Sequence, residues 1–179
     1  MPKTALIVTD MLNPYDHEDA EPLAESVREK LPCIVELRDQ AAESEDTLLV
    51  YANDNQDAWE AGRQELVEKA LNGCHPDLVE PIAPAGPVPF LAKGRHSIFY
   101  MTAMDHLLRV HEVERLILCG QVTEQCILYS ALDAYIRGYE IVVPADAVAH
   151  IDADLAQAAL DMMERNMHAE IISAAASRL

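Results

Sequence analysis

Residues 115–138 read RLILCGQVTEQCILYSALDAYIRG. The run at 115–119 is short and apolar, which is typical of a buried strand. Apolar residues then recur at helical spacing from Thr123 to Arg137, and Gly138 can end the helix in a left-handed conformation. This stretch therefore predicts a strand, a short loop and a helix.

The same unit recurs along the whole chain. Alternating strands and helices predict a parallel sheet covered by helices on both faces. We expect one domain over residues 1–179 with an α/β fold, a three-layer α/β/α sandwich around a six-stranded, mostly parallel, doubly wound sheet. Pro32 interrupts a helical stretch at 23–42 and is expected to open a second helix. The other expected strands are 4–9, 47–52, 88–92, 140–143 and 170–173, and the other expected helices are 57–71, 102–110 and 152–166.

Composition limits the partners. The chain has 179 residues, half of them apolar, and 31 acidic against 13 basic side chains give a formal net charge of −18. Phosphate backbones and anionic lipids repel a charge of this sign, and no basic run offsets it. We therefore expect a small-molecule substrate and neither nucleic acid nor membrane as a partner.

The cysteines and the N-terminal run indicate a compartment. The four cysteines are scattered and form no Cys-x-x-Cys pair, as expected where thiols stay reduced. The apolar run at residues 4–8 is too short for a signal peptide, and no run approaches the roughly 18 residues of a membrane span. We expect a cytoplasmic protein.

Three chemically active side chains fall where expected strands end. Asp10 follows the first strand, Lys93 follows the third, and Cys126 lies in the first turn of the helix after the fourth. The carboxyl ends of parallel strands meet at one edge of the sheet, where ligands bind. A carboxylate, an ammonium and a thiol at that edge can act as base, electrostatic partner and nucleophile in covalent hydrolysis.

Cys126 has a physical reason to be reactive. Thr123 is a good N-cap, which would place Cys126 where free backbone N–H groups and the helix dipole favour a thiolate. Lys93 would also lower the pKa of the thiol, and Asp10 would accept its proton. Ordinary alternatives stay open on spacing alone: a small buried cysteine, a turn aspartate and a solvated lysine.

Several segments carry a resemblance to a known family. They read ALIVTDMLN at 5–13, KGRHSIFY at 93–100 and CGQVTEQC at 119–126, with ALDA at 131–134 and GY at 138–139 behind them. In this order they resemble the isochorismatase-like cysteine hydrolases of the nicotinamidase/isochorismatase superfamily, and the match covers almost the whole chain.

The resemblance implies a catalytic triad of Asp10, Lys93 and Cys126. It also implies a cis peptide before the helix of the nucleophile, expected between Val122 and Thr123, and an oxyanion held by backbone N–H groups near Thr123 and Cys126. The implied activity is hydrolysis of a small-molecule amide C–N bond through a thioester, with no cofactor. Because relatives commonly assemble, a homo-oligomer, a dimer or a tetramer, is expected.

One branch of the family carries a metal. The nicotinamidases hold it on an Asp-x-His-type motif after strand two, where residues 51–59 here read YANDNQDAW and contain no histidine. We therefore expect no metal. Nicotinamide is in doubt as a substrate, because that metal anchors the pyridine nitrogen in those enzymes. Oxygen ligands of this loop could hold a hard cation weakly, although solvated carboxylates are the simpler interpretation.

Other side chains near the strand ends are candidates for contacting the substrate. The aromatic ones are expected to line the pocket, and the asparagines either position polar groups or make side-chain turn bonds. His96 is the histidine nearest in sequence to a proposed catalytic residue. The candidate substrate-binding residues are Asn13, Tyr15, Asn53, Trp59, Phe99 and Tyr100.

Two other functions stay open at this point. An isochorismatase-type hydrolase on the same scaffold cleaves a vinyl ether and can use the carboxylate as an acid without the cysteine, so the presence of Cys126 favours a C–N bond. A non-catalytic module that binds a small molecule would keep the same fold.

Overall fold

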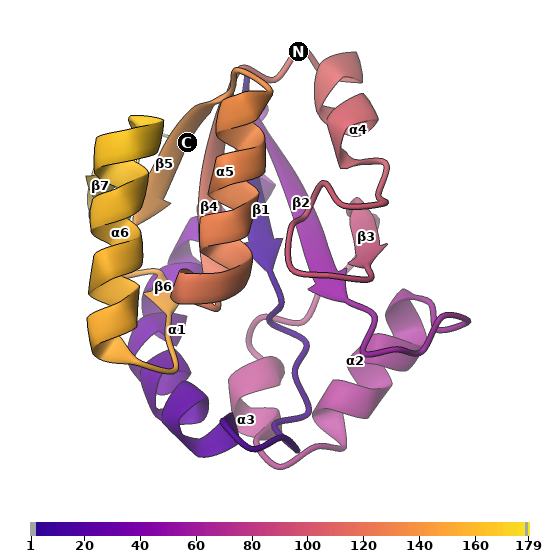
Figure 1. The fold of residues 1–179 in the computed structure, drawn as a ribbon. Helices are drawn as coiled ribbons and strands as arrows, with labels where there is room; N and C mark the ends of the chain where they lie inside the picture. The colour runs from indigo at the N-terminus through magenta and orange to yellow at the C-terminus, as the bar shows by residue number, and fades with distance from the viewer. Residues whose placement is uncertain (1–2, 178) are drawn as a thin grey trace.

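The computed structural model describes residues 3–177 and 179. Its centre is a sheet in which every pairing of the described strands is parallel, with the order β3-β2-β1-β4-β5-β7 and a short β6 beside the end of β4 (Figure 1). The strands are β1 (Thr4–Thr9), β2 (Thr47–Asp54), β3 (Phe90–Lys93), β4 (Arg115–Gln121), β5 (Glu140–Pro144), β6 (Val148–Ala149) and β7 (Glu170–Ile172).

Helices cover both faces of the sheet. In Figure 1, α5 and α6 lie in front of the strands and α1 lies behind them. Side chains of α1, α2 and α3 join one core cluster, and side chains of α4, α5 and α6 join the other. No helix among the described residues has both the length and the apolar character of a membrane span. The helices are α1 (Ala20–Glu43), α2 (Arg63–Leu71), α3 (Pro76–Val79), α4 (Met104–Val110), the π-helical turn η1 (Thr123–Ile127), α5 (Leu128–Ile136), α6 (Ala153–Met167) and the 3₁₀ turn η2 (Ala174–Ala176).

The sheet buries both of its faces because successive side chains of a strand point in opposite directions. In β1, Leu6 and Val8 pack into the cluster that contains α1, whereas Ala5 and Ile7 pack into the opposite cluster. All four are at most 1% exposed. An apolar run buried on both sides is typical of a parallel strand, and the predicted α/β/α sandwich is confirmed.

The strands differ from prediction in two places. The two-residue β6 was not expected. The third strand begins at Phe90, two residues later than expected, and ends at Lys93. Pro87 and Pro89 have no N–H to donate to a ladder, which delays regular pairing until Phe90.

Two helix predictions are wrong. Pro32 does not open a second helix but lies inside α1, which runs unbroken. Pro32 is exposed while Leu31 and Ile34 on either side are buried, so water can satisfy the carbonyl that loses its helical partner. The second helix begins at Arg63 and not at Asp57, since Asn55 Oδ1 accepts the Asp57 N–H at 3.1 Å and holds a turn there.

The closest approach between β1 and β4 requires a glycine. Gly120 pairs in register with Thr9 and has a φ of +109°, a conformation that side chains disfavour. A Cβ at this position would overlap the Thr9 carbonyl oxygen. Because Asp10 follows Thr9 and Gln121 follows Gly120, this contact sets the spacing of two segments at the carboxyl edge of the sheet.

We expect Gly120→Ala to lower the free energy of unfolding by about 3 kcal/mol or more, because backbone strain and steric overlap add. Gly86→Ala is the matched control: Gly86 has a φ of +66°, but a Cβ there meets nothing within 4 Å, so its cost should be about 1 kcal/mol. Urea unfolding followed by circular dichroism measures both. Equal losses would contradict the role given to the Thr9 contact.

Candidate active site

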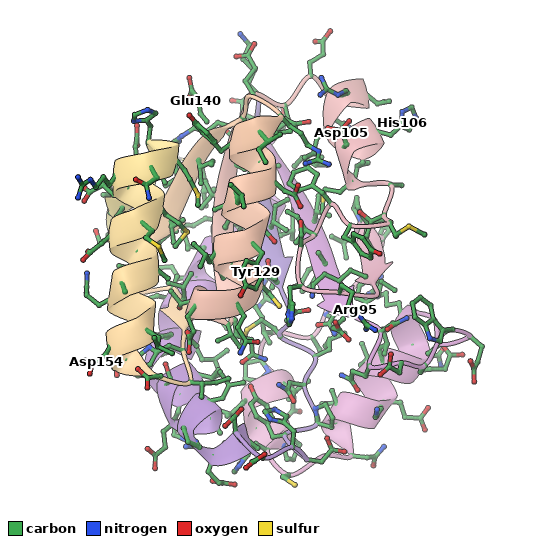
Figure 2. The ribbon with its side chains drawn as sticks, in the orientation of Figure 1. Arg95, Asp105, His106, Tyr129, Glu140 and Asp154 are labelled. Atoms are coloured by element: carbon green, nitrogen blue, oxygen red, sulfur yellow. The ribbon has the colours of Figure 1, made fainter. Side chains whose placement is uncertain are left out.

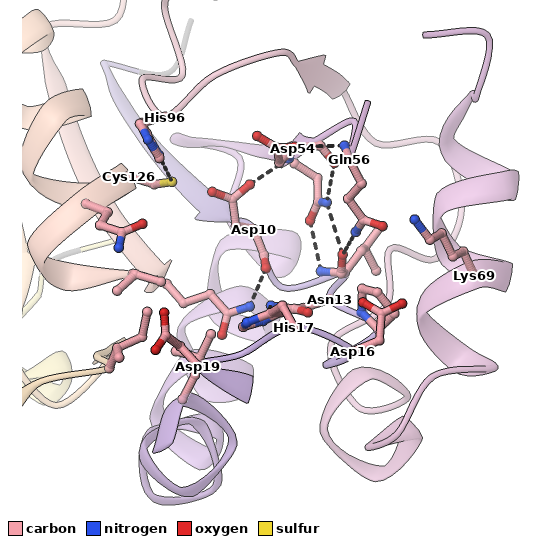
Figure 3. Close-up of a pocket in the computed structure, with 18 of the residues that line it drawn as sticks. Asp10, Asn13, Asp16, His17, Asp19, Asp54, Gln56, Lys69, His96 and Cys126 are labelled. Atoms are coloured by element: carbon pink, nitrogen blue, oxygen red, sulfur yellow. Dashed lines mark hydrogen bonds between the residues drawn. The ribbon is translucent and has the colours of Figure 1, made fainter. Parts of the chain in front are cut away.

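A cavity of about 480 Å³ opens at the carboxyl edge of the sheet (Figure 3). Asp10 and Cys126 form part of its wall, and Lys93 contacts both while having no exposed surface. Three side chains from distant parts of the sequence therefore meet at one place. The other wall residues with ionisable or amide side chains are Asn13, Asp16, His17, Asp19, Asn53, Asp54, Gln56, Asp57, Lys69, His96, Gln121 and Gln125.

Lys93 links the other two members of the group. Its Nζ lies 2.8 Å from Asp10 Oδ2 and 3.6 Å from Cys126 Sγ. A second carboxylate, Asp54, has its Oδ2 3.7 Å from the same nitrogen. A buried ammonium is stable only beside such partners. The charge of Lys93 therefore interacts with Asp10, Asp54 and Cys126 together.

Backbone contacts fix Asp10 between its neighbouring strands. Its backbone is left-handed with a φ of 55°, which is uncommon outside glycine and recurs at functional sites. Its N–H donates to the Ala52 carbonyl of β2 at 2.9 Å, and its Oδ1 accepts the Asp54 N–H at 2.6 Å. From β4, the buried Gln121 Nε2 donates to the Asp10 carbonyl at 2.6 Å. The carboxylate is thus tied to both β2 and β4.

Cys126 lies in η1, the π-helical turn that leads into α5. The Val122 carbonyl accepts the N–H groups of Gln125 and Ile127, each at 3.1 Å. The second of these is the five-residue bond that widens the turn, and such π-turns recur at functional sites. Cys126 is 7% exposed and forms part of the cavity wall.

Two predicted details of this loop are wrong. The cis peptide lies between Gln121 and Val122, one residue earlier than expected. Thr123 does not cap the helix: Val122 holds that position, and the Thr123 hydroxyl donates to the Ala149 carbonyl of β6 at 2.9 Å. Because β6 lies far along the chain, the loop sequence alone does not reveal that acceptor.

The charges of the three side chains depend on one another. Burial raises the pKa of Asp10 against the opposing effect of Lys93. Burial, together with the charge of Asp10, also raises the pKa of the Cys126 thiol. Burial lowers the pKa of Lys93, but Asp10 and Cys126 raise it by more. The expected lowering of the thiol pKa is therefore wrong, because burial and the charge of Asp10 outweigh the effect of Lys93.

Both asparagines predicted to contact substrate line the cavity. The buried Asn53 has a structural role. Its Oδ1 accepts the Leu12 N–H at 2.8 Å, and its Nδ2 donates to the Leu12 carbonyl at 3.2 Å. Asn13 Oδ1 accepts the Tyr15 N–H at 2.7 Å. Tyr15 itself is buried and its hydroxyl donates to Gln121 Oε1 at 3.4 Å, so it supports Gln121 from behind the wall.

The remaining aromatic candidates lie outside this cavity. Trp59 and Tyr100 line a separate hollow of about 330 Å³. Phe99 is buried in the core, stacked on Tyr139 with the Arg137 guanidinium 4.6 Å from its ring centre. Trp59 and Tyr100 therefore lie near the carboxyl ends of β2 and β3 but outside the cavity that holds Asp10 and Cys126.

The loop after β2 does not fit a metal site of the nicotinamidase type. Asp54 Oδ1 accepts the Gln56 N–H at 2.7 Å, and its Oδ2 faces Lys93. These oxygens are engaged in organising the loop and the ammonium. Among residues 3–177 and 179, no three or more His, Cys, Asp or Glu side chains gather as a metal site would require.

Three neighbours of the site were not predicted as members. Asp54 and Gln121 bond to Asp10, and His96 Nδ1 lies 3.6 Å from Cys126 Sγ (Figure 3). Asp54 and Gln121 could have been predicted as neighbours of the site, because they are polar residues at the ends of β2 and β4. His96 follows Lys93 by three residues, which places it near the edge without fixing its direction.

Comparisons with known proteins agree with this arrangement. Residues 4–176 match the family model of the isochorismatase domain. The uncharacterized isochorismatase family protein YaaI of Bacillus subtilis is 34% identical over 167 residues, which make up 93% of this chain and 92% of that protein. The ureidoacrylate amidohydrolase RutB of Serratia proteamaculans is 32% identical over 99 residues, 54% of this chain and 40% of that protein.

A solved structure shows the same fold. The nicotinamidase PncA of Bacillus subtilis superposes with a TM-score of 0.71 and 26% identity, covering 96% of this chain and 99% of that one. The family model, the sequence relative and the shared fold all indicate the same protein family. This chain is a hydrolase of the isochorismatase family.

Proposed function

We propose that this protein is a cysteine-dependent amidohydrolase that cleaves the C–N bond of a small-molecule amide through a thioester on Cys126. The contact of Lys93 with both Asp10 and Cys126 at the cavity wall carries the proposal. Two relatives support the amide class, because PncA is by name a nicotinamidase and RutB an amidohydrolase.

The first step forms the thioester. Asp10 takes the proton of the Cys126 thiol, and the sulfur attacks the amide carbon. Backbone N–H groups near Thr123 and Cys126 hold the oxyanion that develops. Asp10 then returns the proton to the nitrogen as the C–N bond breaks, which releases ammonia or an amine.

The second step releases the acid. Asp10, again a carboxylate, takes a proton from a water molecule that attacks the thioester carbon. The C–S bond breaks, and the proton returns to the sulfur, so the resting thiol is restored. Lys93 stays beside Asp10 and Cys126, whichever of the two is ionised, and no cofactor takes part.

Removing the nucleophile should abolish turnover. We expect Cys126→Ala to lower kcat by about 10³-fold or more, because no other group can form the thioester. Ammonia release from a panel of small primary amides and ureido compounds measures this. Cys74→Ser is the matched control, since Cys74 is exposed and absent from the cavity wall, and it should turn over normally.

Two outcomes would contradict this prediction. Full turnover in Cys126→Ser would favour acid-assisted cleavage of an ether by Asp10. No hydrolysis of any amide, with slow alkylation of Cys126, would favour a binding module.

Removing the ammonium should shift the pH profile. Lys93 lowers the raised pKa of Asp10, so in Lys93→Met that pKa rises further. Because Asp10 must be a carboxylate to act as base, the acid limb of kcat/KM should move to higher pH, and kcat/KM should fall by about 100-fold or more. Steady-state kinetics from pH 5 to 9 test this, with circular dichroism to verify folding. A lower rate with an unmoved acid limb would refute the coupling.

A further inference from the structure

The Cys126 sulfur has a third polar neighbour besides Lys93 and Asp10. His96 Nδ1 lies 3.6 Å from Sγ, and Figure 3 shows the two side chains facing each other at the cavity wall. The imidazole ring lies against Tyr129, with ring centres 5.4 Å apart. Tyr129 lies on the first turn of α5, on the face turned to the viewer in Figure 2. Tyr129 thus packs against the His96 ring, and Nδ1 of that ring faces the Cys126 sulfur.

The thiol has one proton and two neighbours able to accept it. Lys93 Nζ donates to Sγ, so it cannot take the proton. The carboxylate of Asp10 acts electrostatically on the thiol and is its acceptor in the proposed mechanism, and a neutral imidazole nitrogen is an acceptor as well. His96 belongs to the loop after β3 and is exposed, so its other nitrogen can exchange protons with water.

We propose that His96 is a second proton acceptor for Cys126 and forms a thiolate–imidazolium pair with it at the mouth of the cavity. The proton leaves Sγ and binds Nδ1, so an S–H bond breaks, an N–H bond forms and the total charge is unchanged. The role of this pair in turnover rests on the proposed amidohydrolase function.

This route has a physical advantage over transfer to Asp10 alone. Moving the proton to Asp10 would neutralise one side of the ion pair at 2.8 Å with the buried Lys93. Moving it to His96 leaves that pair intact and gives the thiolate two positively charged neighbours, Lys93 and His96, each 3.6 Å from the sulfur. Other charged or titratable groups also lie here: Tyr129 of α5 packs against the ring, Asp54 Oδ2 lies 3.7 Å from Lys93 Nζ, and the Arg95 guanidinium lies 3.7 Å from Asp57.

Alkylation of Cys126 tests the proposal without a substrate. The rate of iodoacetamide modification, followed by intact mass in a Cys74→Ser background, reports the thiolate at each pH. His96→Phe keeps an aromatic ring against Tyr129 but removes the acceptor. We expect it to alkylate about 10-fold more slowly at pH 7 and to need about one pH unit more for the same rate, since one unit corresponds to about tenfold. His106→Phe, an exposed histidine on α4 away from the cavity (Figure 2), should match the parent.

A second pair of variants separates the two acceptors. Asp10→Asn should still alkylate at neutral pH through His96, whereas Asp10→Asn combined with His96→Phe should lose this reactivity by about 10-fold or more. An unshifted pH profile in His96→Phe, whether the rate is unchanged or uniformly lower, would overturn the proposal. If the profile shifts as expected but no amide is hydrolysed, the amidohydrolase function fails and the thiolate–imidazolium pair stands.

Discussion

The ammonium of Lys93 lies in the interior with no exposed surface, between the carboxylate of Asp10 and the thiol of Cys126. Taking such a charge out of water costs several kcal/mol unless opposite charge and hydrogen bonds surround it. In the proposed mechanism the thiol proton moves to the carboxylate, so the negative charge moves from oxygen to sulfur and stays beside the same ammonium. The site can therefore make a nucleophile without changing the charge it buries.

The sheet order explains why a lysine occupies this position. β3 and β1 are separated by β2, so neighbouring strands at about 4.8 Å spacing put roughly 10 Å between the backbones that carry Lys93 and Asp10. Lys93 pairs in register with Asp54 of β2, and its long side chain passes that strand to reach Asp10. A shorter cationic group would stop at Asp54. The second carboxylate thus lies along the path of the lysine and adds to its stabilisation.

The residues that the sequence predicts well are those whose position follows from a local pattern and one topological rule. Apolar runs such as residues 4–9 predict strands, and the rule that carboxyl ends share an edge brings Asp10, Lys93 and Cys126 together. The thiol pKa was predicted with the wrong sign, because burial and the charge of Asp10 outweigh the effect of Lys93, and burial is a property of the folded chain. The Thr123 cap failed for a similar reason, since its hydroxyl bonds to β6, whose position no local pattern indicates.

The cavity has two sides: the group proposed to react lies at the strand ends, and other side chains face it across the cavity. Asp10, Lys93 and Cys126 are held by β1, β3 and η1, and their contacts are mainly with one another and with neighbouring strands. Asp16 and Lys69 lie on the far side of the cavity, from the loop after β1 and from α2 (Figure 3). Changes in those segments alter the shape and charge that a substrate meets while leaving the reacting group in place. Under the proposed function, the three reacting side chains would therefore stay the same while the loop after β1 and α2 set the choice of substrate.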